Sequence, residues 1–114
     1  MNPFVLYHNP KCSKSRQALA ILESHGINPV IIEYLKVPLS IEVITELRSH
    51  FDLKEFVRDN EPVFNDLKLS FEDENKLLNA ILKNPILMQR PIVTHGDQAV
   101  IARPPEKLLK LILK

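Results

Sequence analysis

The sequence predicts a single α/β domain built on a four-stranded mixed sheet, and the order of its apolar patterns leads to that prediction. A short apolar run at 4–7 is followed by a run with helical spacing and then by a β-branched run at 30–34. A stretch of helical spacing without glycine comes next, at about 38–85. Two further strand-like runs, 90–94 and 98–102, precede a last apolar helix. Strands and helices that alternate in this way are typical of an α/β fold.

The first three runs predict a βαβ unit. Residues 4–7 lack polar alternation, which is typical of a strand covered on both faces. Apolar residues within 18–22 give the following helix one buried side. His25-Gly26 should end this helix, because glycine tolerates the left-handed conformation that closes helices. The connections to 30–34 are short, so the two strands should lie parallel.

The middle of the chain, at about 38–85, predicts a helical insertion that packs beside the sheet, with no linker that would free it as a domain. Short helices are expected within 41–57, where apolar residues recur at helical spacing. Ser70 is the expected N-cap of a further helix that carries the apolar residues of 77–82. Asp73 stands at the capping-box position of that helix.

The last third of the chain predicts a hairpin and a helix. Residues 90–94 and 98–102 are joined by His95-Gly96-Asp97, a connection short enough to require antiparallel pairing. Pro104-Pro105 should open the final helix, where a missing N–H group costs little. The resulting order of βαβ, helical insertion and ββα is that of the thioredoxin-like fold, which we expect as a single domain over 1–114.

The composition excludes several classes of protein. A chain of 114 residues with 45% hydrophobic and 25% charged residues is typical of one globular domain. A formal net charge of +1 gives no general field for binding nucleic acid or an anionic membrane. No signal-peptide pattern stands at the start, and no apolar run reaches the roughly 20 residues that span a bilayer. The single cysteine favours a reducing compartment, so we expect a cytoplasmic protein without membrane or nucleic-acid partners.

Cys12 is the leading candidate for a catalytic residue. It ends a polar turn and immediately precedes the first predicted helix, whose unpaired N–H groups favour a thiolate over a thiol. Lys11, Lys14 and Arg16 add positive charge to the same turn. Such settings lower the pKa of a cysteine from about 8.5 to about 3.5–7.5. A buried, inert cysteine is the commonest alternative, but the polar neighbours of Cys12 favour a nucleophile.

The start of the first helix also predicts a site for an oxyanion, because the N–H groups of a helix N-terminus converge on one point. Two serines in this segment, Ser13 and Ser15, are expected to cap the helix. A thiolate repels an oxyanion, so arginine side chains are needed to compensate the charge. The residues expected to form the helix N-terminal site are Ser13, Lys14, Ser15 and Arg16. The candidate arginines by position are Arg58, Arg90 and Arg103; a solvated surface charge is the commoner role for any one arginine, and Arg90 is favoured most by its position.

Three further residue patterns bear on the chemistry. His8 lies four residues before Cys12 and could pair with the thiolate, bind the anion or hydrogen-bond the loop backbone. The other histidines show no metal-ligand spacing with Cys12, so no metal site is predicted. Ser15 occupies the place of the second cysteine in a C-x-x-C motif. Disulfide chemistry would therefore need a sulfur from another molecule.

Three separated segments together resemble the glutaredoxin-coupled arsenate reductase family. They are His-Asn-Pro-Lys-Cys-Ser-Lys-Ser-Arg at 8–16, Met-Gln-Arg-Pro-Ile-Val at 88–93 and Ala-Arg-Pro-Pro-Glu at 102–106. Residues 35–60 are similar to the helical insert of that family, so the resemblance covers nearly the whole chain. The best-characterised branch reads Cys-Gly-Thr-Ser-Arg in the first segment, whereas this chain reads Cys-Ser-Lys-Ser-Arg at 12–16.

This resemblance implies a function and a set of roles. Cys12 would attack arsenate and form a covalent arsenic–sulfur intermediate, and arsenite would be released. Glutathione and glutaredoxin would supply the reducing thiols, with no bound cofactor. The Arg90–Pro91 peptide bond would be cis, which an X-Pro bond can adopt at modest cost. The residues that would hold the oxyanion are Arg58, Arg90 and Arg103, with a weaker contribution from His8.

Two other functions stay open from the sequence. The first is a related thiol enzyme with another substrate, such as glutathione mixed disulfides. The second is a non-enzymatic regulator, like the RNA polymerase-binding relatives of this fold. Those relatives typically carry a C-x-x-C switch, and Ser15 argues against that role here. Fold likeness alone does not choose between these functions.

Overall fold

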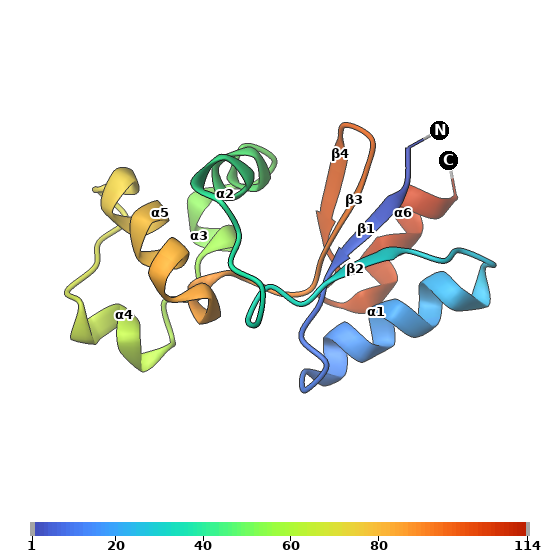
Figure 1. Ribbon diagram of the computed structural model, residues 1–114, viewed down its shortest axis with the longest axis horizontal. Coiled ribbons are helices and arrows are strands. Elements are labelled where there is room, and N and C mark those ends of the chain that lie inside the picture. The colour runs from blue at the N-terminus through green and yellow to red at the C-terminus, as the bar shows by residue number, and fades with distance from the viewer. Residues whose placement is uncertain (1, 114) are drawn as a thin grey trace. The chain divides into compact units, whose positions relative to one another are not determined.

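The computed structural model describes residues 2–113 and divides the chain into two compact units (Figure 1). The first unit contains the chain up to Val37 together with the chain from Arg90 onward. The second unit is Pro38–Gln89, and the insertion expected at about 38–85 falls within it. A single domain over 1–114 stays a prediction. None of the helices within residues 2–113 has the length and apolar character that crossing a membrane requires.

The first unit contains the predicted four-stranded mixed sheet. Its order is β2-β1-β3-β4. Strand β1 pairs in parallel with β2 and antiparallel with β3, and β3 forms an antiparallel hairpin with β4. These pairings confirm the thioredoxin-like arrangement of βαβ followed by ββα. The four strands are β1 Phe4–Tyr7, β2 Val30–Ile32, β3 Ile92–His95 and β4 Gln98–Ile101.

The second strand is shorter than the sequence predicts, because a turn follows it directly. We expected a strand through Tyr34, but β2 ends at Ile32. The carbonyl of Glu33 accepts hydrogen bonds from the N–H groups of Lys36 and Val37, both at 2.9 Å. That carbonyl is therefore used within the turn. Apolar β-branched composition alone does not reveal such a local contact.

One face of the sheet carries the core of the first unit. Leu6 and Val93 are register partners, so their side chains point to the same face. Helix α1, Ser13–Ser24, covers this face together with the short helices η2, Pro105–Leu108, and α6, Leu109–Ile112 (Figure 1). Burying a leucine side chain contributes about 1.5–3 kcal/mol, so this layer stabilises the unit. The buried residues of the cluster are Leu6, Ala18, Leu22, Val93, Ala102, Leu108 and Leu111.

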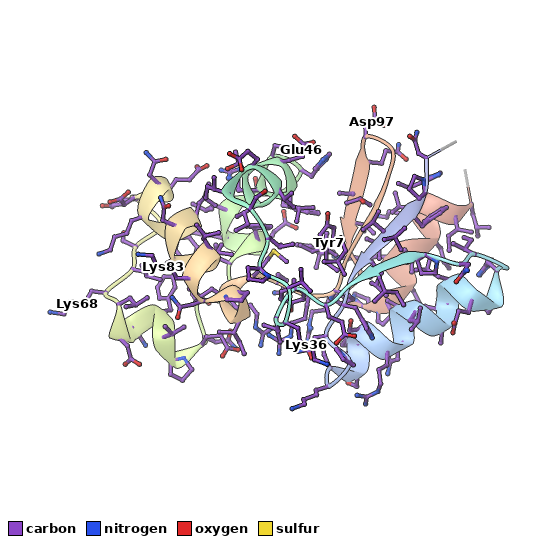
Figure 2. All side chains as sticks on the ribbon, in the orientation of Figure 1. Tyr7, Lys36, Glu46, Lys68, Lys83 and Asp97 are labelled. Carbon is purple, nitrogen blue, oxygen red and sulfur yellow. The ribbon has the colours of Figure 1, made fainter. Side chains whose placement is uncertain are left out.

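Two turns in the first unit use glycine as predicted. Gly26 has a φ of +72° just after α1, where its N–H group donates to the carbonyl of Glu23 at 3.0 Å. Gly96 has a φ of +65° in the hairpin between β3 and β4. Asp97 lies beside it at the tip of that hairpin (Figure 2). Both glycines adopt the left-handed conformation that other residues rarely accept.

The second unit is helical, as predicted, but two of its elements were not expected. Helix α4 and the 3₁₀ helix η1 are each too short to show a hydrophobic period. An isolated antiparallel bridge joins Val57 to Met88 and ties the middle of this unit to its end. The elements are α2 Ile41–Arg48, α3 Leu53–Phe56, α4 Pro62–Asp66, α5 Glu74–Lys83 and η1 Pro85–Leu87.

The predicted N-cap of α5 is wrong. The helix begins at Glu74, and its N-cap is Asp73, whose carboxylate accepts a hydrogen bond from the Lys76 N–H group at 3.1 Å. The Ser70 hydroxyl instead accepts from the Glu72 N–H group at 3.1 Å, within the preceding loop. Serine and aspartate both favour caps and turns, so their spacing left the start of this helix ambiguous by three residues.

This assignment can be tested by unfolding in urea. Asp73→Ala should lower the free energy of unfolding by about 1 kcal/mol, because the first turn of α5 loses its side-chain acceptor. Ser70→Ala is the matched control and should change it by less than about 0.5 kcal/mol. An equal or larger loss for Ser70→Ala would contradict the assignment of Asp73 as the cap.

Candidate active site around Cys12

The register of the sheet brings the N-terminal turn and two arginines to one end of the first unit. Tyr7 ends β1 and pairs with Ile92, the first residue of β3. Arg90 stands two residues before Ile92, so it lies beside the turn that follows Tyr7. Ile101 ends β4 and also pairs with Ile92. Arg103, two residues further on, therefore lies at the same end of the sheet.

The two arginine segments are joined to each other by backbone contacts. The Ala102 N–H group donates to the Pro91 carbonyl at 2.9 Å, which extends the pairing beyond the hairpin strands. Nη1 of Arg103 donates to the carbonyl of Arg90, also at 2.9 Å. The Arg90–Pro91 peptide bond is cis, which is what the family resemblance implies. The Arg103–Pro104 bond is also cis, which was not predicted from the sequence.

The turn that carries Cys12 is shaped by Asn9. The Cys12 N–H group donates to the Asn9 carbonyl at 2.9 Å, and the Lys11 N–H group donates to Asn9 Oδ1 at 3.0 Å. Asparagine is favoured in turns because its side chain can bond the backbone two residues on. The Cys12 carbonyl in turn accepts from the Arg16 N–H group at 3.0 Å, which starts α1. Cys12 is thus the N-cap residue of that helix.

Hydrogen bonds to the sulfur favour the thiolate form of Cys12. Partial burial acts in the opposite direction and raises the pKa of this thiol. Hydrogen bonds from the Ser15 amide and the Arg90 guanidinium lower the pKa, as do those from the Lys14 amide and the Arg103 guanidinium. These donors outweigh burial, so the pKa of Cys12 lies below that of an ordinary thiol. Cys12 is a free cysteine, outside any disulfide bond, and it is half-buried, so a small reagent can reach its thiol.

The predicted capping role of Ser13 and Ser15 is wrong. The N-cap is Cys12, and no side chain caps the helix. Ser13 is exposed, whereas Ser15 is fully buried and turns back beneath the loop. The Ser15 hydroxyl accepts from the Asn9 N–H group at 3.1 Å and lies 2.7 Å from Nδ1 of His8. Its side chain therefore supports the turn, while its backbone amide faces the sulfur of Cys12.

His8 contributes to the turn as a neutral side chain. It is buried, and burial lowers its pKa. The charge of Glu33 raises this pKa and that of Arg16 lowers it, but the net shift is downward. The imidazole is therefore mostly uncharged at pH 7. Of the roles left open by the sequence, the structure favours support of the loop, acting through Ser15. A contribution of His8 to oxyanion binding stays a prediction.

The remaining basic residues of the turn have different positions. The Arg16 guanidinium donates to the Pro10 carbonyl at 2.9 Å and so closes the turn from outside. Lys11 is exposed to solvent, and Lys14 is partly buried. The backbone amide of Lys14 is one of the donors to the sulfur of Cys12. The role of 13–16 as an oxyanion site stays a prediction, which these inward-facing amides support.

Arg58, the third predicted arginine, belongs to the second unit. Its backbone N–H group donates to the Leu87 carbonyl at 2.7 Å. Its Nε donates to Oε2 of Glu61 at 3.1 Å, and its Nη1 donates to Oε1 of Gln89 at 2.9 Å. Neither Glu61 nor Gln89 was predicted from the sequence as a site residue. The spacing of three residues between Arg58 and Glu61 was the available signal for the first contact, and no local signal existed for the second.

The chain is similar to known proteins over nearly its whole length. A model of the ArsC family matches residues 7–111. An arsenate reductase of Haemophilus influenzae is 37% identical over 113 residues, which cover 95% of this chain and 97% of that protein. The uncharacterized protein YfgD of Escherichia coli is 37% identical over 112 residues, covering 94% of each. The solved structure of an arsenate reductase from Vibrio cholerae has a TM-score of 0.88 at 38% identity, covering 94% of this chain and 95% of that one.

The ionisation of Cys12 can be followed by its alkylation rate as a function of pH. The wild-type midpoint should lie below that of a free thiol, because the sulfur accepts hydrogen bonds from amides and guanidinium groups. Arg90→Gln should raise this midpoint, and Arg103→Gln should raise it less. Lys110→Gln removes one exposed charge elsewhere and should leave the midpoint unchanged. A midpoint that Arg90→Gln does not move would contradict the assigned contact.

The supporting role of Ser15 can be tested by unfolding. Ser15→Ala should lower the free energy of unfolding by about 1–3 kcal/mol, because it leaves the buried Asn9 N–H group without its acceptor. Ser13→Ala removes an exposed hydroxyl from the same turn and should change it by less than about 0.5 kcal/mol. If both variants were equally stable, the buried hydrogen bonds of Ser15 would contribute nothing to the turn.

Proposed function

The chain belongs to the ArsC family, and we propose that it is an arsenate reductase that uses Cys12 as its nucleophile. The single observation that carries this proposal is the convergence of two backbone amides and two arginine side chains on the Cys12 sulfur. Such donors stabilise a thiolate, which is the reactive form of cysteine. They also suit a tetrahedral oxyanion, since arginine binds oxyanions through paired hydrogen bonds and helix N-termini bind anions.

The first proposed step is nucleophilic displacement at arsenic. The Cys12 thiolate attacks arsenic(V), a sulfur–arsenic bond forms, and one arsenate oxygen leaves as hydroxide or, after protonation, as water. No electrons are transferred at this stage. Arg90 and Arg103 lie beside the sulfur and would offset the negative charge that the two reactants bring together. Arg58 would serve as a third oxyanion ligand, as the family resemblance implies.

Reduction of arsenic(V) to arsenic(III) then needs two electrons, which two thiols supply when they become a disulfide. Cys12 is the only cysteine in the chain, so the second thiol must come from another molecule. We assign this role to glutathione, which would form a mixed disulfide with Cys12 as arsenite leaves. Glutaredoxin would then reduce that mixed disulfide. A location in the cytoplasm, where thiols are kept reduced, fits this requirement.

The proposal is tested by measuring arsenite formed from arsenate by the purified protein with glutathione and glutaredoxin. Wild-type protein should form arsenite only when both thiol donors are present. Cys12→Ser should form none, because an alcohol of ordinary pKa replaces the thiolate. Arg90→Ala should lower kcat/KM for arsenate by about 100-fold, as expected for the loss of one donor at a charged centre.

The same assay separates this proposal from the alternatives. Reduction of a small glutathione mixed disulfide with little sensitivity to Arg90→Ala, and no arsenite from arsenate, would show a thiol enzyme with another substrate. Full biological activity of Cys12→Ser would show a non-enzymatic role. Either result would overturn the proposed reaction.

A further inference from the structure

Arg58 is held by two side chains from different parts of the second unit. Its Nε donates to Glu61 at 3.1 Å and its Nη1 donates to Gln89 at 2.9 Å. The side chains of Arg58 and Glu61 are only 12% and 18% exposed. An ion pair screened by bulk solvent is worth little, but this pair is largely removed from water, where the contact is stronger.

The backbone beneath these three residues is itself fixed. The Arg58 N–H group donates to the Leu87 carbonyl at 2.7 Å, and the Gln89 N–H group donates to the Phe56 carbonyl at 2.8 Å. The segments 56–58 and 87–89 are therefore paired on both sides of Val57, the residue next to Arg58. The Glu61 N–H group also donates to the Arg58 carbonyl, at 3.3 Å. Each side chain of the contact thus starts from an ordered backbone position.

Arginine has a long side chain, and holding it in one orientation costs conformational entropy. Because Glu61 and Gln89 already order the Arg58 side chain in the folded protein, ligand binding does not have to supply this entropy cost. The two contacts use Nε and Nη1, and neither uses Nη2, which carries two of the five N–H groups of a guanidinium. The two contacts therefore fix the orientation of the guanidinium plane. They leave the N–H groups of Nη2 for another acceptor. This is preorganisation of a binding group.

We propose that Glu61 is a positioning residue for oxyanion binding, which acts by holding the Arg58 guanidinium in one orientation. This inference rests on the proposed function, in which Arg58 is an oxyanion ligand. Glu61 does not touch the substrate in this scheme. Its effect should therefore appear in the binding of arsenate and should require Arg58.

A purely structural role for Glu61 is the main alternative. Under this alternative, Glu61 would serve the start of α4, of which it is the N-cap residue although its side chain makes no capping hydrogen bond. In that case, the loss of Glu61 would lower stability and activity whether or not Arg58 were present. A double-mutant cycle separates the two roles, because residues that act as one unit give non-additive effects.

The experiment measures KM and kcat for arsenate in the glutathione- and glutaredoxin-coupled assay, with thermal unfolding of each variant as a check on folding. Glu61→Ala should raise KM by about tenfold and change kcat by less than about threefold, because the lost interaction acts in binding. Glu61→Gln keeps an oxygen acceptor for Nε and should restore KM to within about threefold of wild type. Asp59→Ala removes an exposed carboxylate next to Arg58 and should leave KM unchanged.

The cycle is completed in the Arg58→Ala background. There, adding Glu61→Ala should raise KM by less than about twofold further, since the Arg58 guanidinium that it positions is gone. Equal effects of Glu61→Ala in both backgrounds would overturn the inference while leaving the proposed reaction intact. So would a Glu61→Ala protein with the KM of Asp59→Ala. Wild-type protein that forms no arsenite would overturn the proposed function and, with it, this inference.

Discussion

The lowered pKa of the Cys12 thiol is the feature on which the rest of the site depends. Partial burial raises the pKa of this thiol. The amides at the start of α1 and the side chains of Arg90 and Arg103 lower it by more. These donors come from opposite ends of the chain. The antiparallel pairing of β1 with β3 brings them together, since it places the N-terminal turn and the hairpin ends at the same edge. The register of the sheet therefore determines which residues surround the Cys12 sulfur.

The side chains around the sulfur divide into charged donors and neutral supports. Arg90 and Arg103 supply positive charge beside the Cys12 sulfur, which is where the proposed reaction would bring the oxyanion. His8 and Ser15 lie beneath the turn, are buried, and contribute hydrogen bonds without charge. This division explains how a chain with a formal net charge of only +1 can provide a strong local field. The positive field at the sulfur comes from the positions of Arg90 and Arg103, not from the net charge of the chain.

The sequence was informative where a local pattern determines the structure. The strand at 4–7, the first helix and the position of Cys12 at its start all follow from period and turn chemistry. The hairpin was also predicted, but its strands at 90–94 and 98–102 are Ile92–His95 and Gln98–Ile101 in the structure. The sequence failed where two local solutions compete, as with Ser70 and Asp73 before α5. It also failed where a contact joins distant residues. Ser15 looked like a helix cap, and only the folded loop shows that its hydroxyl turns back to His8 and Asn9.

The two ends of the hairpin of β3 and β4 carry different residues. One end holds Arg90 and Arg103, which are joined to each other by a hydrogen bond of 2.9 Å. The other end is the short turn at Gly96 and Asp97. The length of the hairpin separates this turn from the arginines, and each four-residue strand is roughly 13 Å long at about 3.3 Å per residue. A fluorophore or an affinity tag grafted at Asp97 would therefore report on the molecule without disturbing its reactive edge.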